Sequence, residues 1–175
     1  KALKVKEELL TYSLRKGSKQ DITRDKNGLT PALGNIGLAY FEQKNYPKAL
    51  EYYFRALRIS TETGDVVRTA VQYSNIGAVY LQFAAESKLA GEASLETENL
   101  TKAFDYYAKG LTFAQKLGNK SYLASWNSEL GNISTRQKKY LQAYHYLSTA
   151  IKTCDSIGVA DTKKFCLQYL SQLYE

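Results

Sequence analysis

Apolar residues recur along the chain at the three- and four-residue spacing of an amphipathic α-helix. Two stretches have apolar residues at the same spacing, three and then four residues apart: Leu33, Ile36, Tyr40 and Tyr73, Ile76, Tyr80. The pattern predicts helix pairs, with first helices at about 30–44, 67–84 and 121–137 and second helices at about 46–63, 100–117 and 140–157. We therefore expect an all-α chain built from repeated helix pairs.

The spacing of small residues sets the repeat. The interval from Gly37 to Gly77 is 77 − 37 = 40, and the interval from Gly77 to Gly131 is 131 − 77 = 54, which exceeds the first by 14. The interval from Gly37 to Ala49 is 49 − 37 = 12, whereas the interval from Gly77 to Ala103 is 103 − 77 = 26, again an excess of 14. The second repeat therefore carries an insertion of this length between its helices.

Capping residues mark the ends of the second helices. Glycine favours the left-handed conformation that stops a helix, and Gly64, Gly118 and Gly158 each follow a second helix. Asn45 and Asn99 stand at equivalent places before two of these helices, where an asparagine side chain can cap free backbone N–H groups. Each second helix thus has a predicted start or stop.

Two segments interrupt the array. The first, Ala84 to Glu98, contains Gly91, and its length predicts that both flanking helices lengthen by about two turns around a loop there. The second, roughly Tyr12 to Asn27, is polar and basic and is expected to be a linker. The expected organisation is a preceding second helix with its basic linker at 1–29, then repeats at 30–66, 67–120 with the insertion at about 84–98, and 121–160, then a truncated first helix at 161–175.

These positions resemble the tetratricopeptide repeat, in which a large residue, Leu-Gly, Tyr, Ala, an aromatic residue and Ala recur over a helix pair. The matching residues are Leu33, Ile36, Gly37, Tyr40, Ala49, Tyr53 and Ala56, then Tyr73, Ile76, Gly77, Tyr80, Ala103, Tyr107 and Gly110, then Leu130, Gly131, Ser134, Ala143, Leu147 and Ala150. The resemblance implies a right-handed superhelical array, an α-solenoid of antiparallel helix pairs. The 40-residue period, longer than the usual 34, is similar to arrays in kinesin light chains, Pins-type adaptors and bacterial signalling proteins.

The resemblance also implies a concave groove lined by the first helices, where a protein or peptide would bind. The groove residues expected from this register are Asn35, Leu38, Phe41, Glu42, Asn75, Leu81, Gln82, Glu129, Asn132 and Arg136, and Ala78 shares the face of those in the second repeat. Two interpretations stay open for several of them. Asn35 and Asn75 either bind a partner or are duplicated amides that face water or bond within the array, and Phe41 and Leu81 either contact a ligand or pack within the array. A clamp for chaperone tails is disfavoured, because Gly34, Ser74 and Ser128 stand where such a clamp needs lysine.

Catalytic chemistry has little support in the sequence. His145 is the single histidine and lies between two tyrosines, where packing or surface exposure is favoured over a catalytic or metal-binding role. No nucleophile elbow or phosphate-binding glycine loop is present. Cys154 and Cys166 fit buried free thiols better than a disulfide. We expect a protein that is not an enzyme, with no cofactor and no metal.

Net charge is the feature that favours a different partner. The chain has a formal charge of +7, which suggests a helical-repeat RNA-binding module as the alternative function. Its basic residues are spread along helices, as on a solvated helix face, so nucleic acid is disfavoured as a partner. The apolar runs fall short of a membrane span, and no membrane contact is expected. Cut repeats at both ends suggest self-association as a further property.

The main expectation is a non-catalytic scaffold that binds a protein or peptide. By its resemblance it would be the sensory or regulatory region of a larger bacterial signalling protein, fused to a histidine kinase, cyclase or transcriptional regulator. Its expected location is the cytoplasm, or the periplasm if a signal peptide lay upstream.

Overall fold

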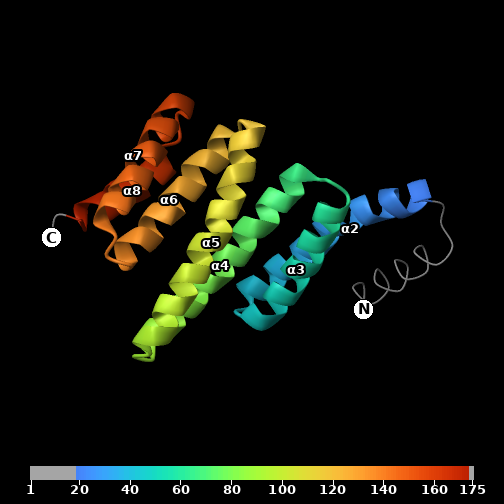
Figure 1. The fold of residues 1–175 in the computed structure, drawn as a ribbon, viewed down its shortest axis with the longest axis horizontal. Coiled ribbons are helices and arrows are strands. Elements are labelled where there is room, and N and C mark those ends of the chain that lie inside the picture. The colour runs from blue at the N-terminus through green and yellow to red at the C-terminus, as the bar shows by residue number, and fades with distance from the viewer. Residues whose placement is uncertain (1–18, 174–175) are drawn as a thin grey trace. The chain divides into compact units, whose positions relative to one another are not determined.

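The computed structural model describes the backbone of residues 19–173 and the side chains of residues 28–173 (Figure 1). Within this part the chain forms helices and turns and no strand, which confirms the all-α fold. The helices are α2 (Lys19–Glu42), α3 (Tyr46–Glu62), α4 (Val66–Leu89), α5 (Ala93–Leu117), α6 (Lys120–Arg136), α7 (Tyr140–Ile157) and α8 (Ala160–Ser171). Helices joined by short turns form antiparallel pairs, the architecture of a helical repeat protein.

The chain divides into two compact units, Lys1–Thr69 and Ala70–Glu175, and each has its own packing. In the first unit α2 packs along α3. Buried Leu33, Tyr52, Ala56 and Ile59 form the core between them, because their helical spacing places them on facing stripes. The preceding second helix, expected within residues 1–29 before the basic linker, lies outside the described residues.

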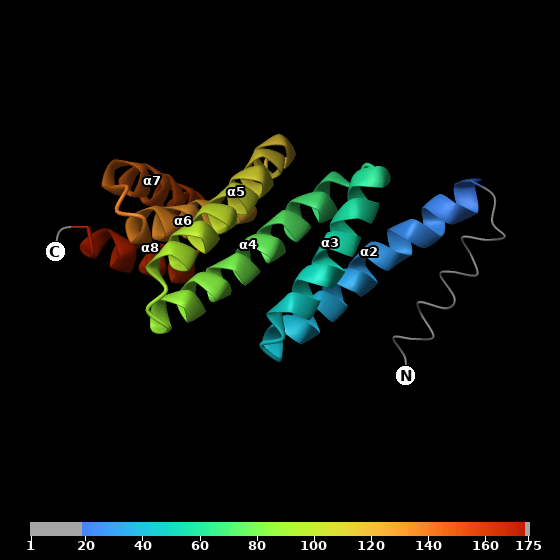
Figure 2. The ribbon, with the colours of Figure 1, turned by 60° about the horizontal axis from the view of Figure 1, so that its bottom comes forward.

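The second unit packs its helices in succession. Figures 1 and 2 show α4 and α5 side by side and joined by a tight turn, and α6, which packs against α5, also contacts α7 and α8. Its main core includes Ala103, Tyr107, Trp126, Leu130 and Ile133, drawn from α5 and α6. In this unit α4, α5 and α6 therefore pack around one shared hydrophobic core.

The glycines that define the repeat lie where two helices of a pair cross closely. A Cβ atom added to these glycines would lie 2.6 Å from the Tyr53 ring at Gly37, 2.7 Å from the Tyr107 ring at Gly77, and 2.5 Å from Leu147 at Gly131. Real Cβ atoms do not come within 3.0 Å of such neighbours. The space beside each of these glycines is therefore already occupied by the side chain of the partner helix. The packing gained there offsets the roughly 1 kcal/mol that glycine costs a helix.

The predicted helix stops are confirmed by the backbone. Gly118 and Gly158 cap α5 and α7 with φ of 62° and 71°, in the left-handed region, and Gly64, after the α3 cap, has φ of 70°. Asn45 caps α3 as expected: its side-chain oxygen accepts a hydrogen bond from the backbone N–H of Lys48 at 3.3 Å.

The start of α2 differs from the expectation. We expected the first helix to begin near residue 30 after a basic linker, but α2 begins at Lys19 and includes Pro31. The segment before Pro31 is polar, so it lacks the regular spacing of apolar residues that would predict a helix. Proline also normally favours a helix start over a helix interior. Residues 19–29 are thus part of α2 and not a linker, and the remainder of the expected linker lies outside the described residues.

The insertion forms the end of the α4–α5 hairpin. α4 ends at Leu89, Gly91 occupies the turn with φ of 75°, and α5 begins at Ala93. α4 and α5 have 24 and 25 residues, compared with 17 in α6 and 18 in α7, so both helices are lengthened as predicted.

The lengthened α5 overturns one capping assignment. Asn99 is buried inside α5 and its side-chain amide donates to the Ser87 hydroxyl at 3.4 Å, so it is not an N-cap. The repeat alignment placed the helix start too late because the insertion itself is helical.

Candidate partner-binding site

A cavity of about 270 Å³ lies among α4, α5 and α6 in the second unit. Five of the ten expected groove residues line it: Leu81 and Gln82 from α4, and Glu129, Asn132 and Arg136 from α6. Ala78 and Ala85 of α4 and Tyr107 of α5 complete the wall. The packing of this unit therefore gathers one set of the expected residues around a single space.

Helical geometry explains this grouping. Ala78, Gln82 and Ala85 are three or four residues apart on α4, and Glu129, Asn132 and Arg136 have the same spacing on α6. Residues at such spacings share one face of a helix. Two such stripes meet here because α4 and α6 both contact the core around Tyr107 and Leu130.

Glu129 is the electrostatic centre of the cavity. The carboxyl group is partly buried, and burial raises its pKa above the usual range, while a hydrogen bond from Asn132 acts in the opposite direction. The pKa of the neighbouring Tyr107 hydroxyl is raised as well, first by its own burial and then by the charge of Glu129. No ion pair of the described side chains involves Glu129, so its charge is not compensated within this part of the chain.

Arg136, in contrast, has a partner. Its guanidinium donates to the Glu96 carboxylate at 3.1 Å, and the two side chains are only 23% and 21% exposed. Glu96 belongs to the insertion in the second repeat, whereas Arg136 belongs to the third repeat. The insertion therefore supplies the counter-ion for one wall of the cavity.

A second cavity of about 280 Å³ lies between α6 and α8, lined by Ser125, Ser128, Glu129, Thr162, Phe165 and Tyr169. Glu129 lines both cavities. Next to it, burial raises the pKa of the Cys166 thiol, and a hydrogen bond with Ser128 opposes that shift. Cys154 and Cys166 are both free and buried, as expected from the sequence.

The expected groove residues of the first unit lie on α2. Asn35 and Glu42 are exposed, and Leu38 is 47% exposed. The Phe41 ring packs against Tyr46 with 5.5 Å between ring centroids, a contact that fits the packing interpretation of this residue. Glu42 also acts on its surroundings, because burial and then the Glu42 charge raise the pKa of Tyr53 to about 12.

Asn75 was also expected in the groove, but it does not line this cavity of the second unit. Its side-chain amide donates to Gln72 at 3.5 Å, one turn earlier on α4. That bond fits the interpretation in which the duplicated amide interacts within the array.

Sequence reasoning missed two residues of the cavity wall, Ala85 and Tyr107. Ala85 continues the stripe that holds Ala78 and Gln82, so helical spacing could have identified it. Tyr107 was expected only as a packing residue of the repeat, and its ring indeed covers Gly77 while it also lines the cavity. One aromatic side chain thus contributes to both the core and the candidate site.

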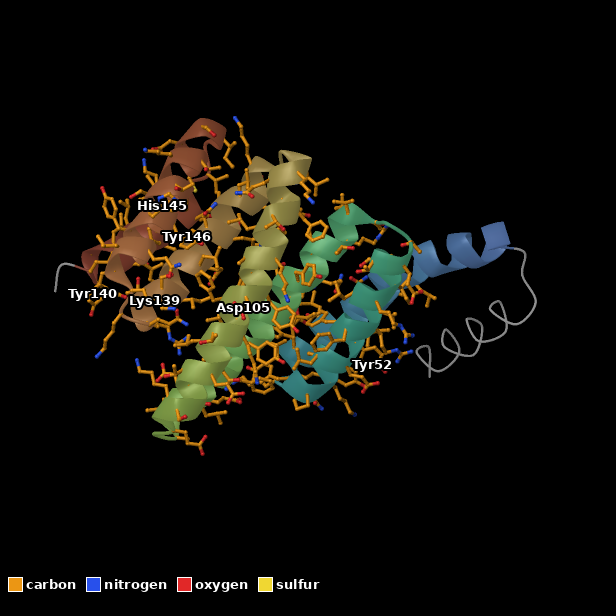
Figure 3. The ribbon with its side chains drawn as sticks, viewed as in Figure 1. Tyr52, Asp105, Lys139, Tyr140, His145 and Tyr146 are labelled. Atoms are coloured by element: carbon orange, nitrogen blue, oxygen red, sulfur yellow. The ribbon has the colours of Figure 1, made fainter. Side chains whose placement is uncertain are left out.

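The remaining candidate chemistry of the sequence is on the surface. His145 of α7 is exposed and lies beside Tyr146, with 5.8 Å between the ring centroids (Figure 3). Among residues 19–173 no three His, Cys, Asp or Glu side chains gather in a way that could hold a metal ion. In the same part of the chain, no helix combines the length and apolar character needed to span a membrane.

Comparison with known proteins supports the fold. The crystal structure titled "BtubC (BKLC) from P. vanneervenii" matches with a TM-score of 0.70 and 20% identity, over 99% of this chain and 64% of that one. This chain therefore spans less than two thirds of that protein, and the likeness shows the fold alone. The structure titled "DHF119 filament" has 15% identity over 98% of this chain and 89% of that one, and its TM-score is 0.35. No curated protein matches the chain.

A family comparison identifies the repeat directly. Residues 30–60 match the model of the tetratricopeptide repeat, and this segment covers the last part of α2 and most of α3. Tetratricopeptide repeats form non-catalytic scaffolds for protein–protein interaction. Residues 30–60 thus form one tetratricopeptide repeat, and the helical-repeat fold of the other described residues is consistent with an array of such repeats.

Proposed function

We propose that this chain is a non-catalytic scaffold that binds a protein or peptide along its first helices. The observation that carries the proposal is the cavity among α4, α5 and α6, because five residues that the repeat register predicts line it. Leu81, Gln82, Asn132 and Arg136 are all partly exposed, so a partner can reach them.

The side chains around the cavity suit a peptide. Gln82 and Asn132 carry amides that both donate and accept hydrogen bonds, as peptide backbone groups require. Leu81, Ala78 and Ala85 supply apolar surface beside these amides. The wall thus combines amide and charged groups with apolar side chains, and convergent polar groups that fix the orientation of a ligand are a feature of binding sites.

We further propose that the scaffold is the sensory or regulatory region of a larger bacterial signalling protein. This context rests on the resemblance of the 40-residue period to the arrays in such proteins. A histidine kinase, cyclase or transcriptional regulator is the proposed effector, and sequencing the gene on both sides of the segment tests this directly.

The binding proposal is tested by selecting a displayed random-peptide library on the immobilised chain and measuring affinities of the enriched peptides. Leu81→Arg places a long cation in the cavity wall, whereas Leu141→Arg makes the same exchange at a position of α7 that is 90% exposed and outside the cavity. We expect at least a tenfold affinity loss for the first variant, about 1.4 kcal/mol, and none for the second.

Because Leu81 also packs against the core, Gln82→Ala provides a second cavity variant that leaves the core intact. Thermal unfolding confirms that each variant is folded. Affinity that is lost equally in the Leu141→Arg control, or retained in both cavity variants, would contradict binding at this site.

Single-stranded RNA is assayed in parallel, and RNA affinity with a steep salt dependence would favour the alternative function.

A further inference from the structure

We propose that the cavity among α4, α5 and α6 accepts a lysine or arginine side chain of the partner peptide, with the Glu129 carboxylate as its counter-ion. This inference rests on the proposed function, which it extends by naming the chemistry that the site recognises. The occupant is one side chain of a peptide and not a small-molecule ligand, since about 270 Å³ is below the usual range of roughly 300–1,000 Å³ for small-molecule pockets.

The charges around the cavity indicate a cation. Arg136 is already paired with Glu96 at 3.1 Å, so these two charges compensate each other. Glu129 has a hydrogen bond from Asn132 but no ion pair among the described side chains. A carboxylate that is partly buried without a counter-ion is costly, and a cation brought by the partner would remove that cost.

The walls suit the stem of a long basic side chain. Lysine and arginine carry several methylene groups that pack on apolar surface while the charged end reaches a polar group. Ala78, Leu81 and Ala85 provide that apolar surface on α4, and Glu129 and Asn132 face them from α6. Gln82 adds an amide oxygen that can accept a further hydrogen bond from the cation.

The overall charge of +7 does not exclude a basic partner. At physiological ionic strength the screening length is about 8 Å, so exposed charges elsewhere on the surface are largely screened at the cavity. The Glu129 charge is closer and less solvated, and screening reduces its interaction with an occupant much less.

The ionisation of Glu129 gives the interaction a pH dependence. Because burial raises the pKa of this carboxyl, Glu129 takes up a proton at a higher pH than an exposed glutamate does. A protonated carboxyl no longer attracts a cation, so affinity should fall as the pH decreases through this pKa.

Other groups near Glu129 do not reproduce this effect. On α5 and α8 the pKa values of Tyr107, Cys166 and Tyr169 are raised, so these side chains stay neutral in acid. The cavity wall from α4 holds no titratable side chain. The contribution of the ion pair between Arg136 of α6 and Glu96 of α5 is tested separately by Glu96→Gln.

The experiment uses the same displayed peptide library on wild type, Glu129→Gln and Glu86→Gln. The first exchange removes the charge but keeps a similar shape, and the second is a matched control at an exposed glutamate of α4 outside the cavity. We expect a position enriched in Arg or Lys with wild type and with Glu86→Gln, and no such enrichment with Glu129→Gln. Replacing that residue by citrulline, an uncharged analogue of arginine, should weaken binding to wild type by about tenfold to a hundredfold.

The outcomes separate this inference from the proposed function. Enriched peptides without a basic position, or a basic preference that persists in Glu129→Gln, overturn the inference and leave peptide binding intact. A library with no enriched peptide on wild type contradicts the proposed function itself, and this inference with it. Affinity that does not change on acidification also overturns the role of the Glu129 charge, because a purely structural glutamate would give that result.

Discussion

Two glycines of the same helix should respond differently to the same substitution. Gly28 and Gly37 both lie inside α2. A Cβ atom at Gly28 would have no neighbour within 4 Å, whereas a Cβ atom at Gly37 would lie 2.6 Å from two ring atoms of Tyr53. The comparison isolates packing, because both substitutions change glycine to alanine in a helix of the same unit.

The magnitudes follow from two terms. Alanine improves helix propensity by roughly 1 kcal/mol over glycine at either position. At Gly28 that gain should remain, so Gly28→Ala should stabilise the chain by about 1 kcal/mol. At Gly37 the new methyl group must displace the ring of Tyr53, which is only 2% exposed, and overpacking of this kind costs about 1–3 kcal/mol. Gly37→Ala should therefore range from neutral to about 2 kcal/mol destabilising.

Thermal unfolding followed by circular dichroism measures both variants. In a chain of this size 1 kcal/mol corresponds to about 2–4 °C in Tm, so Gly28→Ala should melt higher than wild type and Gly37→Ala at or below wild type. Gly37→Leu, expected from the sequence to cost roughly 1–3 kcal/mol, adds a larger side chain at the same contact and should melt lower still. Equal stabilisation by both alanines would refute the close approach of α2 and α3 at this glycine.

Three further perturbations test other contacts. Asn119→Ala should cost about 1 kcal/mol in unfolding free energy, because the Asn119 side chain caps α6 by accepting from the backbone N–H of Tyr122 at 3.0 Å; an unchanged Tm would contradict that cap. Glu129→Gln should raise Tm at neutral pH: a carboxyl with a raised folded-state pKa stabilises most below its unfolded pKa and loses that contribution as pH rises through the folded pKa. The difference between the variant and wild type should thus shrink in acid, and a difference that grows there would contradict the burial of this carboxyl. A double-mutant cycle of Glu96→Gln and Arg136→Gln should give a coupling of up to about 1 kcal/mol that decreases with added salt, and no coupling would mean that the pair is not maintained in solution.

The repeat architecture could be predicted from the sequence because each repeat has small residues at fixed positions and apolar residues at helical spacing. Gly37, Gly77 and Gly131 mark the helix crossings, and Gly118 and Gly158 mark helix ends with a backbone conformation that other residues avoid. These signals arise within one helix pair, and they do not depend on how one pair packs against the next.

The errors arose where the local signal was weak or displaced. The first part of α2 is polar and contains Pro31, so neither apolar spacing nor proline preference indicated a helix there. Asn99 aligned with a true cap, Asn45, but the helical insertion moved the start of α5 to Ala93. In both cases a longer helix replaced the boundary that the repeat pattern suggested.

The candidate site could be predicted only in part. The resemblance to the repeat family implied Glu129, Asn132 and Arg136 as groove residues, and these three side chains line a cavity. Spacing alone could not identify Glu96 as the partner of Arg136, because that contact depends on how far the insertion extends α5. That Glu129 has no ion pair among the described side chains likewise depends on how α4, α5, α6 and α8 pack around it.

The contact of each glycine with its large partner also bears on how such chains evolve. Gly37 contacts Tyr53 and Gly131 contacts Leu147 across the same interval in sequence (53 − 37 = 16 and 147 − 131 = 16), while the interval from Gly77 to Tyr107 is 107 − 77 = 30. The contact is therefore made inside one helix pair, and extra residues at the hairpin end do not disturb it. A gene duplication that copies one pair copies the whole contact, so repeats can be gained, lost or lengthened without compensating mutations elsewhere at these crossings.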